Sequence, residues 1–267
     1  MTLITSNQNP FVKHIKSLKD KKHREEKKLF LIEGIRFVEE ALKEQADIKL
    51  IAVSEGLHQT KGGKEVFELA QKSLSCEMVT LSHKVFKEIS DTDTPQGILA
   101  VVEIKRFKLE DILNRGGLIV ILDSLQDPGN MGTIIRTADA AAASGIVLSR
   151  GCVDVYNPKV LRSTMGSIFH IPFYTPDSLP DTIMELKKYG YKVMAAHLKG
   201  DLNYFEQEIG ERAAIILGNE ANGISQEIAA LAHSLVRIPM PGRAESLNAS
   251  VAAALLIYES VRRKTML

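Results

Sequence analysis

The chain has 267 residues, of which 45% are hydrophobic and 25% charged, a composition typical of a globular protein with one large or two modest domains. The formal net charge is +1, so overall charge does not indicate nucleic-acid binding, and such evidence must come from local patterns. Cys76 and Cys152 are far apart and form neither a CxxC metal motif nor a disulfide framework. The N-terminus lacks a signal-peptide core, and the longest apolar runs are too short to cross a bilayer. We therefore expect a soluble cytoplasmic protein, with no metal and no membrane partner.

The first 105 residues alternate predicted strands and helices, which indicates a small α/β unit. We expect strands at 29–32, 50–54, 77–81 and 98–104, and helices at 35–44, 64–73 and 82–89. The charged stretch that follows predicts a domain boundary. The expected organisation is a domain over 1–105, a linker over 106–112 and a second domain over 113–267.

A locally basic stretch lies between Lys13 and Lys28, where lysines and arginines outnumber the acidic residues. Such a face can neutralise phosphates, with a salt-dependent gain in affinity for each contact. The alternative, weighted equally, is a solvated helix face, because acidic residues interrupt the run. The candidate contacts are Lys13, Lys16, Lys22 and Arg24.

The second half also alternates, with strands expected at 118–122, 145–149, 170–174, 191–196, 213–217 and 235–238. Helices are expected at 131–143, 157–165, 181–189 and 225–233, followed by a closing helix. This pattern predicts a mostly parallel sheet covered on both faces. Ligands of such sheets collect beyond the carboxyl ends of the strands.

Polar residues follow three of these strands. After the first, the run 127–139 places Gly132 and Arg136 four residues apart on one helical face, where a guanidinium suits phosphate; the alternative is a surface salt-bridge partner. After 213–217 come Gly218 and Glu220, where the alternative is a turn with a solvated carboxylate. The glycine spacing is not G-x-G-x-x-G, and no carboxylate follows the next strand, so a nicotinamide enzyme is disfavoured.

The third run follows the strand at 235–238. Pro239 and Pro241 end that strand, and Ser246 is the predicted N-cap of the closing helix. Ser246, Leu247 and Asn248 would then lie where unpaired backbone N–H groups and the positive end of the helix dipole attract a ligand. The alternative is an ordinary capped helix. One face of that helix carries Leu247, Val251, Leu255 and Tyr258.

Taken together, these runs resemble the TrmH/SpoU family of RNA ribose 2′-O-methyltransferases, within the knotted SPOUT superfamily. The resemblance covers roughly 118–263 and rests on Asn130-x-Gly132-x-x-x-Arg136-Thr-Ala, Leu217-Gly-Asn-Glu220-x-x-Gly223, and Ile238-Pro-Met240 with Ser246-Leu-Asn-x-Ser250-Val-Ala. The N-terminal half is more loosely similar to the family's substrate-binding domain, which is like ribosomal protein L30e.

The resemblance implies an α/β fold in which an L30e-like domain precedes a C-terminal trefoil-knotted methyltransferase domain. It also implies a homodimer whose interface lies beside the site. S-adenosylmethionine would be bound by backbone groups near Gly218, Ile238, Met240 and Leu247, with Leu217 beside them. Ala196 stands where relatives often have threonine, at a minor cofactor contact.

The resemblance further implies transfer of a methyl group to a ribose 2′-hydroxyl of RNA, with Arg136, Glu220, Ser246 and Asn248 as catalytic residues. We expect Arg136 to grip a phosphate and stabilise charge on the 2′-oxygen, because guanidinium stays protonated and is a poor base. Glu220 and Asn248 would hold Arg136 and the ribose, and Ser246 would hydrogen-bond near the hydroxyl. RNA contacts are expected from Asn130 and from the basic face over 13–28.

Ribosomal RNA is favoured over transfer RNA, on family architecture alone. Two alternatives stay open: a non-catalytic RNA-binding or ribosome-assembly factor, which would be expected to lose part of the polar set, and a knotted enzyme that methylates a base.

Overall fold

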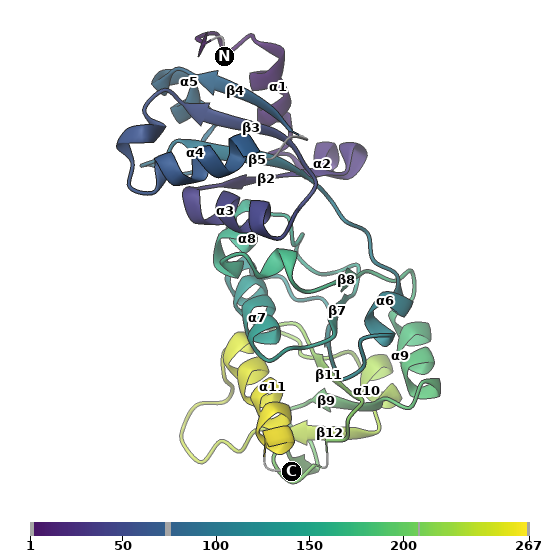
Figure 1. Ribbon diagram of the computed structural model, residues 1–267. Coiled ribbons are helices and arrows are strands. Elements are labelled where there is room, and N and C mark those ends of the chain that lie inside the picture. Colours follow the sequence, from purple (N-terminus) through teal and green to yellow (C-terminus); the bar gives the residue numbers. More distant parts are fainter. Residues whose placement is uncertain (1–2, 73–75, 208, 266–267) are drawn as a thin grey trace. The chain divides into compact units, whose positions relative to one another are not determined.

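A computed structural model of the chain describes residues 3–72, 76–207 and 209–265. The chain forms two compact units, coloured by sequence in Figure 1. Unit 1 comprises residues 1–105 together with 156–169, and unit 2 comprises 106–155 and 170–267. The chain therefore leaves the C-terminal unit for a short excursion, and the residues of that excursion pack with the N-terminal ones.

Unit 1 is built on a five-stranded sheet in the order β1-β4-β3-β5-β2. The strands are β1 (Leu3–Ile4), β2 (Leu29–Glu33), β3 (Ile48–Ser54), β4 (Glu77–Leu81) and β5 (Ile98–Glu103). β5 runs antiparallel to both β2 and β3, whereas β3, β4 and β1 are parallel. β2 is therefore an edge strand.

Helices cover both faces of this sheet. α1 (Pro10–Ser17) and α5 (His83–Ile89) bury Val12, Ile15 and Phe86 against it. α3 (Ile35–Lys43) and α4 (Gly63–Lys72) pack together, with the 3₁₀ turn η1 (Leu57–Gln59) beside α4. α2 (Lys21–Lys27) and, from the excursion, α8 (Pro158–Thr164) lie against β2, and η2 (Ser167–Phe169) follows α8. The last residue of the helix predicted over 64–73 lies outside the described residues.

Unit 2 contains a seven-stranded sheet in the order β10-β12-β9-β11-β6-β7-β8, in which every strand pair is parallel. The strands are β6 (Leu118–Leu122), β7 (Gly145–Leu148), β8 (Phe173–Tyr174), β9 (Lys192–Ala196), β10 (Leu202–Asn203), β11 (Ala213–Leu217) and β12 (Ser234–Arg237). β6 and β11 are buried along their whole length, as near-continuous apolar runs in a covered parallel sheet should be.

One face of this sheet is covered by α6 (Leu109–Leu113), α9 (Leu179–Lys188) and α10 (Gln226–Leu231), and the other by α7 (Pro128–Ala140) and α11 (Ala249–Thr265) (Figure 1). α6 occupies most of the stretch that was expected to be a linker. The predicted α/β class with a mostly parallel C-terminal sheet is confirmed, and the trefoil knot stays a prediction. In the ranges that the structure describes, no helix has the length and apolarity needed to span a membrane.

Candidate active site at the carboxyl ends of the central strands

Because β9, β11 and β6 are parallel neighbours, the loops that follow them emerge at one edge of the sheet. The loop after β6 leads into α7, and the loop after β11 carries Glu220. The carboxylate of Glu220 accepts hydrogen bonds from the backbone N–H groups of Gln126 (3.2 Å) and Asp127 (3.0 Å). It therefore ties the loop after β11 to the start of α7, which Asp127 caps by accepting from the N–H of Asn130 at 2.7 Å.

These hydrogen bonds also set the charge of Glu220. Burial raises the pKa of its carboxyl, but the bonds from the N–H of Asp127, the amide of Asn130 and the N–H of Gln126 outweigh that effect, so the net pKa lies below its ordinary value. At neutral pH Glu220 is an anion that accepts hydrogen bonds. It is poorly suited to take a proton from a substrate.

Asn130 joins all three polar runs. Its side chain is buried, with 7% of its surface exposed. Its Nδ2 donates to Oε1 of Glu220 at 3.2 Å, and its Oδ1 accepts from Nδ2 of Asn248 at 2.9 Å. The amide is thus engaged at both ends within the protein, which leaves it unsuited to the predicted RNA contact and suited to a positioning role.

The start of the closing helix differs from the prediction. α11 begins at Ala249, and Oδ1 of Asn248 accepts from the N–H groups of Ser250 (2.9 Å) and Val251 (3.4 Å) and from the hydroxyl of Ser250 (2.6 Å). Asn248 is therefore the N-cap, and the prediction that Ser246 caps this helix was wrong. Both residues have N-cap character, and the bond from Asn248 to Asn130 favours the later start.

A tight turn follows β11. A Cβ on Gly218 would lie 2.2 Å from the carbonyl carbon of Gly223, a separation that no side chain tolerates. The backbones of Asn219 and Gly223 exchange two hydrogen bonds of 2.9 Å, and the amide of Asn219 donates to the carbonyl oxygen of Ser124 at 2.9 Å. The glycine in this run is required by close backbone approach, which fixes the direction of Glu220.

Arg136 lies on α7, about 1.7 turns beyond Asn130, with its side chain exposed. Within the described residues its guanidinium makes no hydrogen bond or ion pair. Glu220 and Asn248 direct their side chains to Asn130 and its neighbours. Neither makes a hydrogen bond to Arg136 in the described chain, and the expectation that they hold Arg136 stays a prediction. Ser246 is also exposed, in the non-helical run before α11.

The predicted cofactor residues gather at the same edge of the sheet. Ala196 and Leu217 are the last residues of β9 and β11, Gly218 follows directly, and Ile238 and Met240 follow β12. β12 pairs with β9, and β9 with β11, so the ends of three adjacent strands contribute. Among the described residues, no hydrogen bond uses the N–H of Gly218, Ile238, Met240 or Leu247. Unpaired backbone groups beside apolar side chains fit an adenine ring and a polar amino-acid group.

The basic face predicted over 13–28 is largely used within unit 1. Arg24 is buried, and its Nη1 donates to the carbonyl oxygens of Leu18 (2.9 Å) and Lys19 (2.7 Å), so the prediction of an RNA contact there was wrong. Lys16 lies 3.4 Å from a carboxylate oxygen of Glu88. Lys13 and Lys22 are exposed. A run of charges in the sequence does not reveal which cations already have partners.

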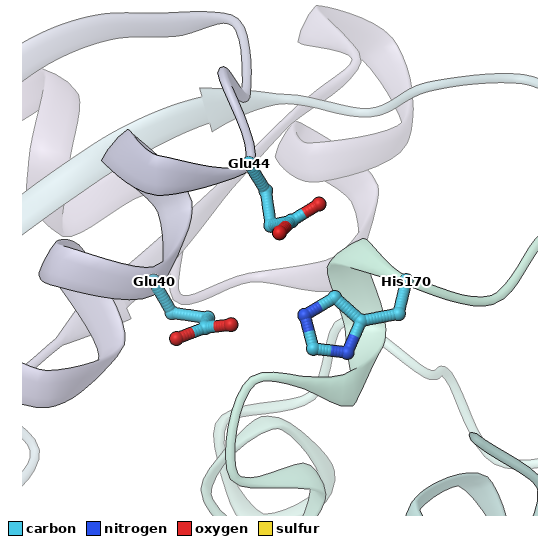
Figure 2. A group of neighbouring side chains, drawn as sticks. All are labelled: Glu40, Glu44 and His170. Carbon is cyan, nitrogen blue, oxygen red and sulfur yellow. The ribbon is translucent and has the colours of Figure 1, made fainter. Parts of the chain in front are cut away.

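Two carboxylates lie one helical turn apart at the end of α3, as Figure 2 shows for Glu40 and Glu44. His170, also drawn there, belongs to unit 2, where its Nδ1 lies 2.9 Å from Oδ2 of Asp139. Two carboxylates offer fewer ligands than the six or more oxygens that calcium or magnesium requires. We therefore assign no metal to this pair.

Comparison with known proteins identifies the family of this chain. Residues 117–258 match the model of the SpoU rRNA methylase family, and residues 9–100 match that of the MRM3-like substrate binding domain. The chain belongs to the SpoU rRNA methylase family. The three polar runs that meet through Glu220, Asn130 and Asn248 all lie within the matched residues.

Relatives are similar over almost their whole length. The 23S rRNA (guanosine(2553)-2′-O)-methyltransferase RlmP of Bacillus subtilis (strain 168) is 39% identical, covering 97% of this chain and 98% of the relative. The crystal structure of an AdoMet-bound rRNA methyltransferase from Sinorhizobium meliloti superposes with a TM-score of 0.86 at 34% identity, covering 98% of each chain. That of the SpoU methyltransferase AviRb from Streptomyces viridochromogenes in complex with AdoMet gives 0.87 at 27% identity, covering 97% of this chain and 99% of AviRb.

Proposed function

We propose that this protein transfers a methyl group from S-adenosylmethionine to a ribose 2′-hydroxyl of ribosomal RNA. The observation that carries the proposal is the hydrogen-bonded link from Glu220 through Asn130 to Asn248, which joins the family's three motifs at one edge of the sheet. Support for the substrate comes from the relatives, because RlmP and the 23S rRNA (uridine(2479)-2′-O)-methyltransferase of Streptomyces viridochromogenes are both named for 2′-O-methylation of 23S rRNA. Transfer RNA is the alternative substrate.

The cofactor would supply an electrophilic methyl group on a cationic sulfur. We assign its binding to Ala196, Leu217, Gly218, Ile238, Met240 and Leu247. The N–H groups of Gly218, Ile238, Met240 and Leu247 have no partner in the described chain and are free to hydrogen-bond a ligand. Two relatives of known structure, from Sinorhizobium meliloti and Streptomyces viridochromogenes, are described as holding AdoMet.

In the reaction a bond forms between the 2′-oxygen and the methyl carbon, the carbon–sulfur bond breaks with its electron pair left on sulfur, and the hydroxyl proton passes to water. We assign Arg136 to the RNA: its exposed guanidinium, which has no partner among the described residues, is free to hold a phosphate and to stabilise negative charge on the 2′-oxygen. Ser246, exposed before α11, would hydrogen-bond near that hydroxyl. Glu220, Asn130 and Asn248 act as positioning residues, since they fix α7 and the start of α11.

Methyl transfer tests this function directly. Tritiated S-adenosylmethionine is incubated with total RNA from a strain that lacks the gene, and the label is followed into nucleosides and into RNA separated by size. We expect label in a 2′-O-methylnucleoside of large ribosomal RNA. Label in transfer RNA would show that transfer RNA is the substrate, and label on a base would show that the enzyme methylates a base and not the ribose. Absence of label with intact cofactor binding would favour a non-catalytic RNA-binding factor.

Arg136 supplies the sharper test of the mechanism. Arg136→Ala should abolish turnover while calorimetry shows nearly unchanged affinity for S-adenosylmethionine. Arg136→Lys keeps the charge and loses the planar fork, so we expect it to remain far below the wild-type rate. A near-normal rate for the lysine variant would refute a two-pronged phosphate grip by Arg136.

We also propose that the protein is a homodimer formed through α11. Val251 and Tyr258 each keep 48% of their surface exposed, and Leu247 and Leu255 keep 36%. The opposite side of the same helix is fully packed, with Ala253 and Ile257 at 0% exposure. Three of these large apolar side chains, Val251, Leu255 and Tyr258, lie at helical spacing on one exposed face of α11, and Leu247 precedes the helix; such a face is typical of an interface.

A second copy of the chain is the proposed occupant of this face, beside the cap residue Asn248. Sedimentation should give a dimer for the wild type and a monomer for Tyr258→Glu. Tyr189→Glu is the matched control, because Tyr189 is similarly exposed, at 47%, but lies at the end of α9. A monomeric wild type, or a Tyr258→Glu protein that stays dimeric, would exclude this interface.

A further inference from the structure

α8 presents two cations that the sequence analysis did not single out. Lys159 and Arg162 lie three residues apart, so they share one face of the helix, and both are exposed. Neither cationic group makes a hydrogen bond or ion pair within the described chain. No acidic residue occurs anywhere in 156–169. The segment thus contributes basic and no acidic side chains to unit 1.

The helix that carries the two cations is packed firmly against unit 1. Two aromatic rings contact Phe30 of β2, with the ring centroids of Tyr156 and Phe169 at 4.7 and 6.3 Å. Phe169 also contacts Phe37 of α3, at 5.7 Å between centroids. Val160, Leu161 and Thr164 of α8 are buried. Rigid placement lowers the conformational entropy lost when the two cations bind a ligand.

Arg162 borders a hollow along the edge strand β2, whose lining includes Phe37, Leu161, Glu33 and Asp91. The two carboxylates that line the hollow already have partners elsewhere in unit 1. Glu33 accepts from the hydroxyls of Ser90 (2.5 Å) and Thr92 (2.7 Å) and from the N–H of Asp91 (2.9 Å). Asp91 forms an ion pair of 2.7 Å with Lys19. Neither carboxylate forms an ion pair with Arg162 in the described chain, so the Arg162 guanidinium stays available to an external anion.

Chain connectivity leads to this surface from a segment that contacts the loop between β6 and α7. The N–H of Val153 donates to the carbonyl of Leu125 at 2.8 Å, and Leu125 directly precedes Gln126, one of the residues held by Glu220. Lys159 follows Val153 by only six residues. Along the chain, α8 thus follows closely on a segment that is hydrogen-bonded to the loop before α7.

We propose that Lys159 and Arg162 bind backbone phosphates of the RNA substrate. The inference rests on the proposed function, which supplies the RNA. It assigns the contact to α8 in place of much of the predicted face over 13–28, where Arg24 and Lys16 are engaged within the protein. A guanidinium or ammonium group without an intramolecular partner can neutralise an RNA phosphate, and the counterion condensed on that phosphate is then released.

The test compares two pairs of substitutions. Affinity for protein-free large-subunit ribosomal RNA, transcribed in vitro, is measured between 50 and 200 mM salt, a range over which about 10³- to 10⁵-fold affinity is lost by proteins with many phosphate contacts. Lys159→Gln with Arg162→Gln should weaken binding about tenfold or more and should lower the slope of log affinity against log salt by about 1 to 2. The matched control is Lys84→Gln with Lys87→Gln, an exposed pair of lysines that also lie three residues apart, on α5.

Equal losses for the two pairs, or an unchanged slope for the α8 pair, would overturn the inference. Thermal unfolding verifies that the variants fold, and if the double variant does not, Lys159→Gln alone should lower the slope by roughly 0.7 to 0.9. Methyl transfer by the wild type separates the two proposals. An active wild type with no effect of the α8 pair refutes the surface alone, whereas a wild type that neither binds nor methylates RNA refutes the proposed function.

Discussion

Replacement of Asn130 by alanine tests the link between the three polar runs. The substitution removes two hydrogen bonds, one to the Glu220 carboxylate at 3.2 Å and one from the Asn248 amide at 2.9 Å. A bond to a charged group contributes about 1.5–3 kcal/mol and a neutral one about 0.5–1.5 kcal/mol. Glu220 and Asn248 are both exposed, so water replaces part of the loss, and we expect the free energy of unfolding to fall by about 2 kcal/mol.

Two measurements check this expectation. Urea unfolding gives the total loss, and hydrogen exchange follows the amides of Ser250 and Val251, which Asn248 caps. Both amides should exchange faster in Asn130→Ala, and methyl transfer should fall, although Asn130 touches no reacting atom. Thr133→Ala is the control, since Thr133 lies on the same helix and its hydroxyl, in the described chain, bonds only to the carbonyl oxygen of Gly129. A loss below about 0.5 kcal/mol, with unchanged exchange at Ser250, would refute the link.

Two further predictions concern the loop after β11. Because the pKa of Glu220 is lowered in the folded protein, its carboxylate stabilises the fold above the unfolded pKa of about 4.3, and this stability is lost as pH falls through the folded pKa. Glu220→Gln should therefore be less stable than wild type at pH 7 and equal to it in strong acid. An equal loss of stability at pH 7 in Glu245→Gln, which removes an exposed carboxyl without a bond in the described chain, would contradict this. Gly218→Ala should cost about 3 kcal/mol or more in urea unfolding, because its Cβ meets rigid backbone at 2.2 Å; Gly242→Ala, with no atom within 4 Å, should be near neutral.

The sequence predicted most of the architecture, because buried parallel strands are continuous apolar runs with clear punctuation. The run 118–122 was predicted as a strand and is β6, and 213–217 is β11. Prediction was weaker where tertiary contacts determine the ends of an element. The strand expected over 170–174 is reduced to Phe173–Tyr174, and the helix expected to follow Ser246 starts at Ala249, because the cap is set by a bond from Asn248 to a distant residue.

The candidate site was found as a set of residues and only partly as an arrangement. Spacing along the chain placed Glu220, Arg136 and Asn248 at strand ends, but it could not show that Glu220 and Asn248 both reach Asn130. That contact joins residues separated by 118 and 90 positions in the sequence. The packing of α8 with unit 1 was invisible for the same reason, since a stretch between two strands of one sheet gives no sign that it belongs to another core.

The hydrogen bonds at this edge of the sheet divide the polar residues into two kinds. In the first kind, the side chains hydrogen-bond to one another and to backbone groups; these are Glu220, Asn130 and Asn248. The same hydrogen bonds lower the pKa of Glu220. Arg136 and Ser246 have exposed side chains close to these residues in the sequence motifs. A site that must hold a flexible polyanion benefits from this division, because groups already satisfied keep the loops in place while unsatisfied donors retain their capacity for the substrate. On this reasoning, substitutions of the first kind should alter stability together with turnover, and substitutions of the second kind should alter turnover alone.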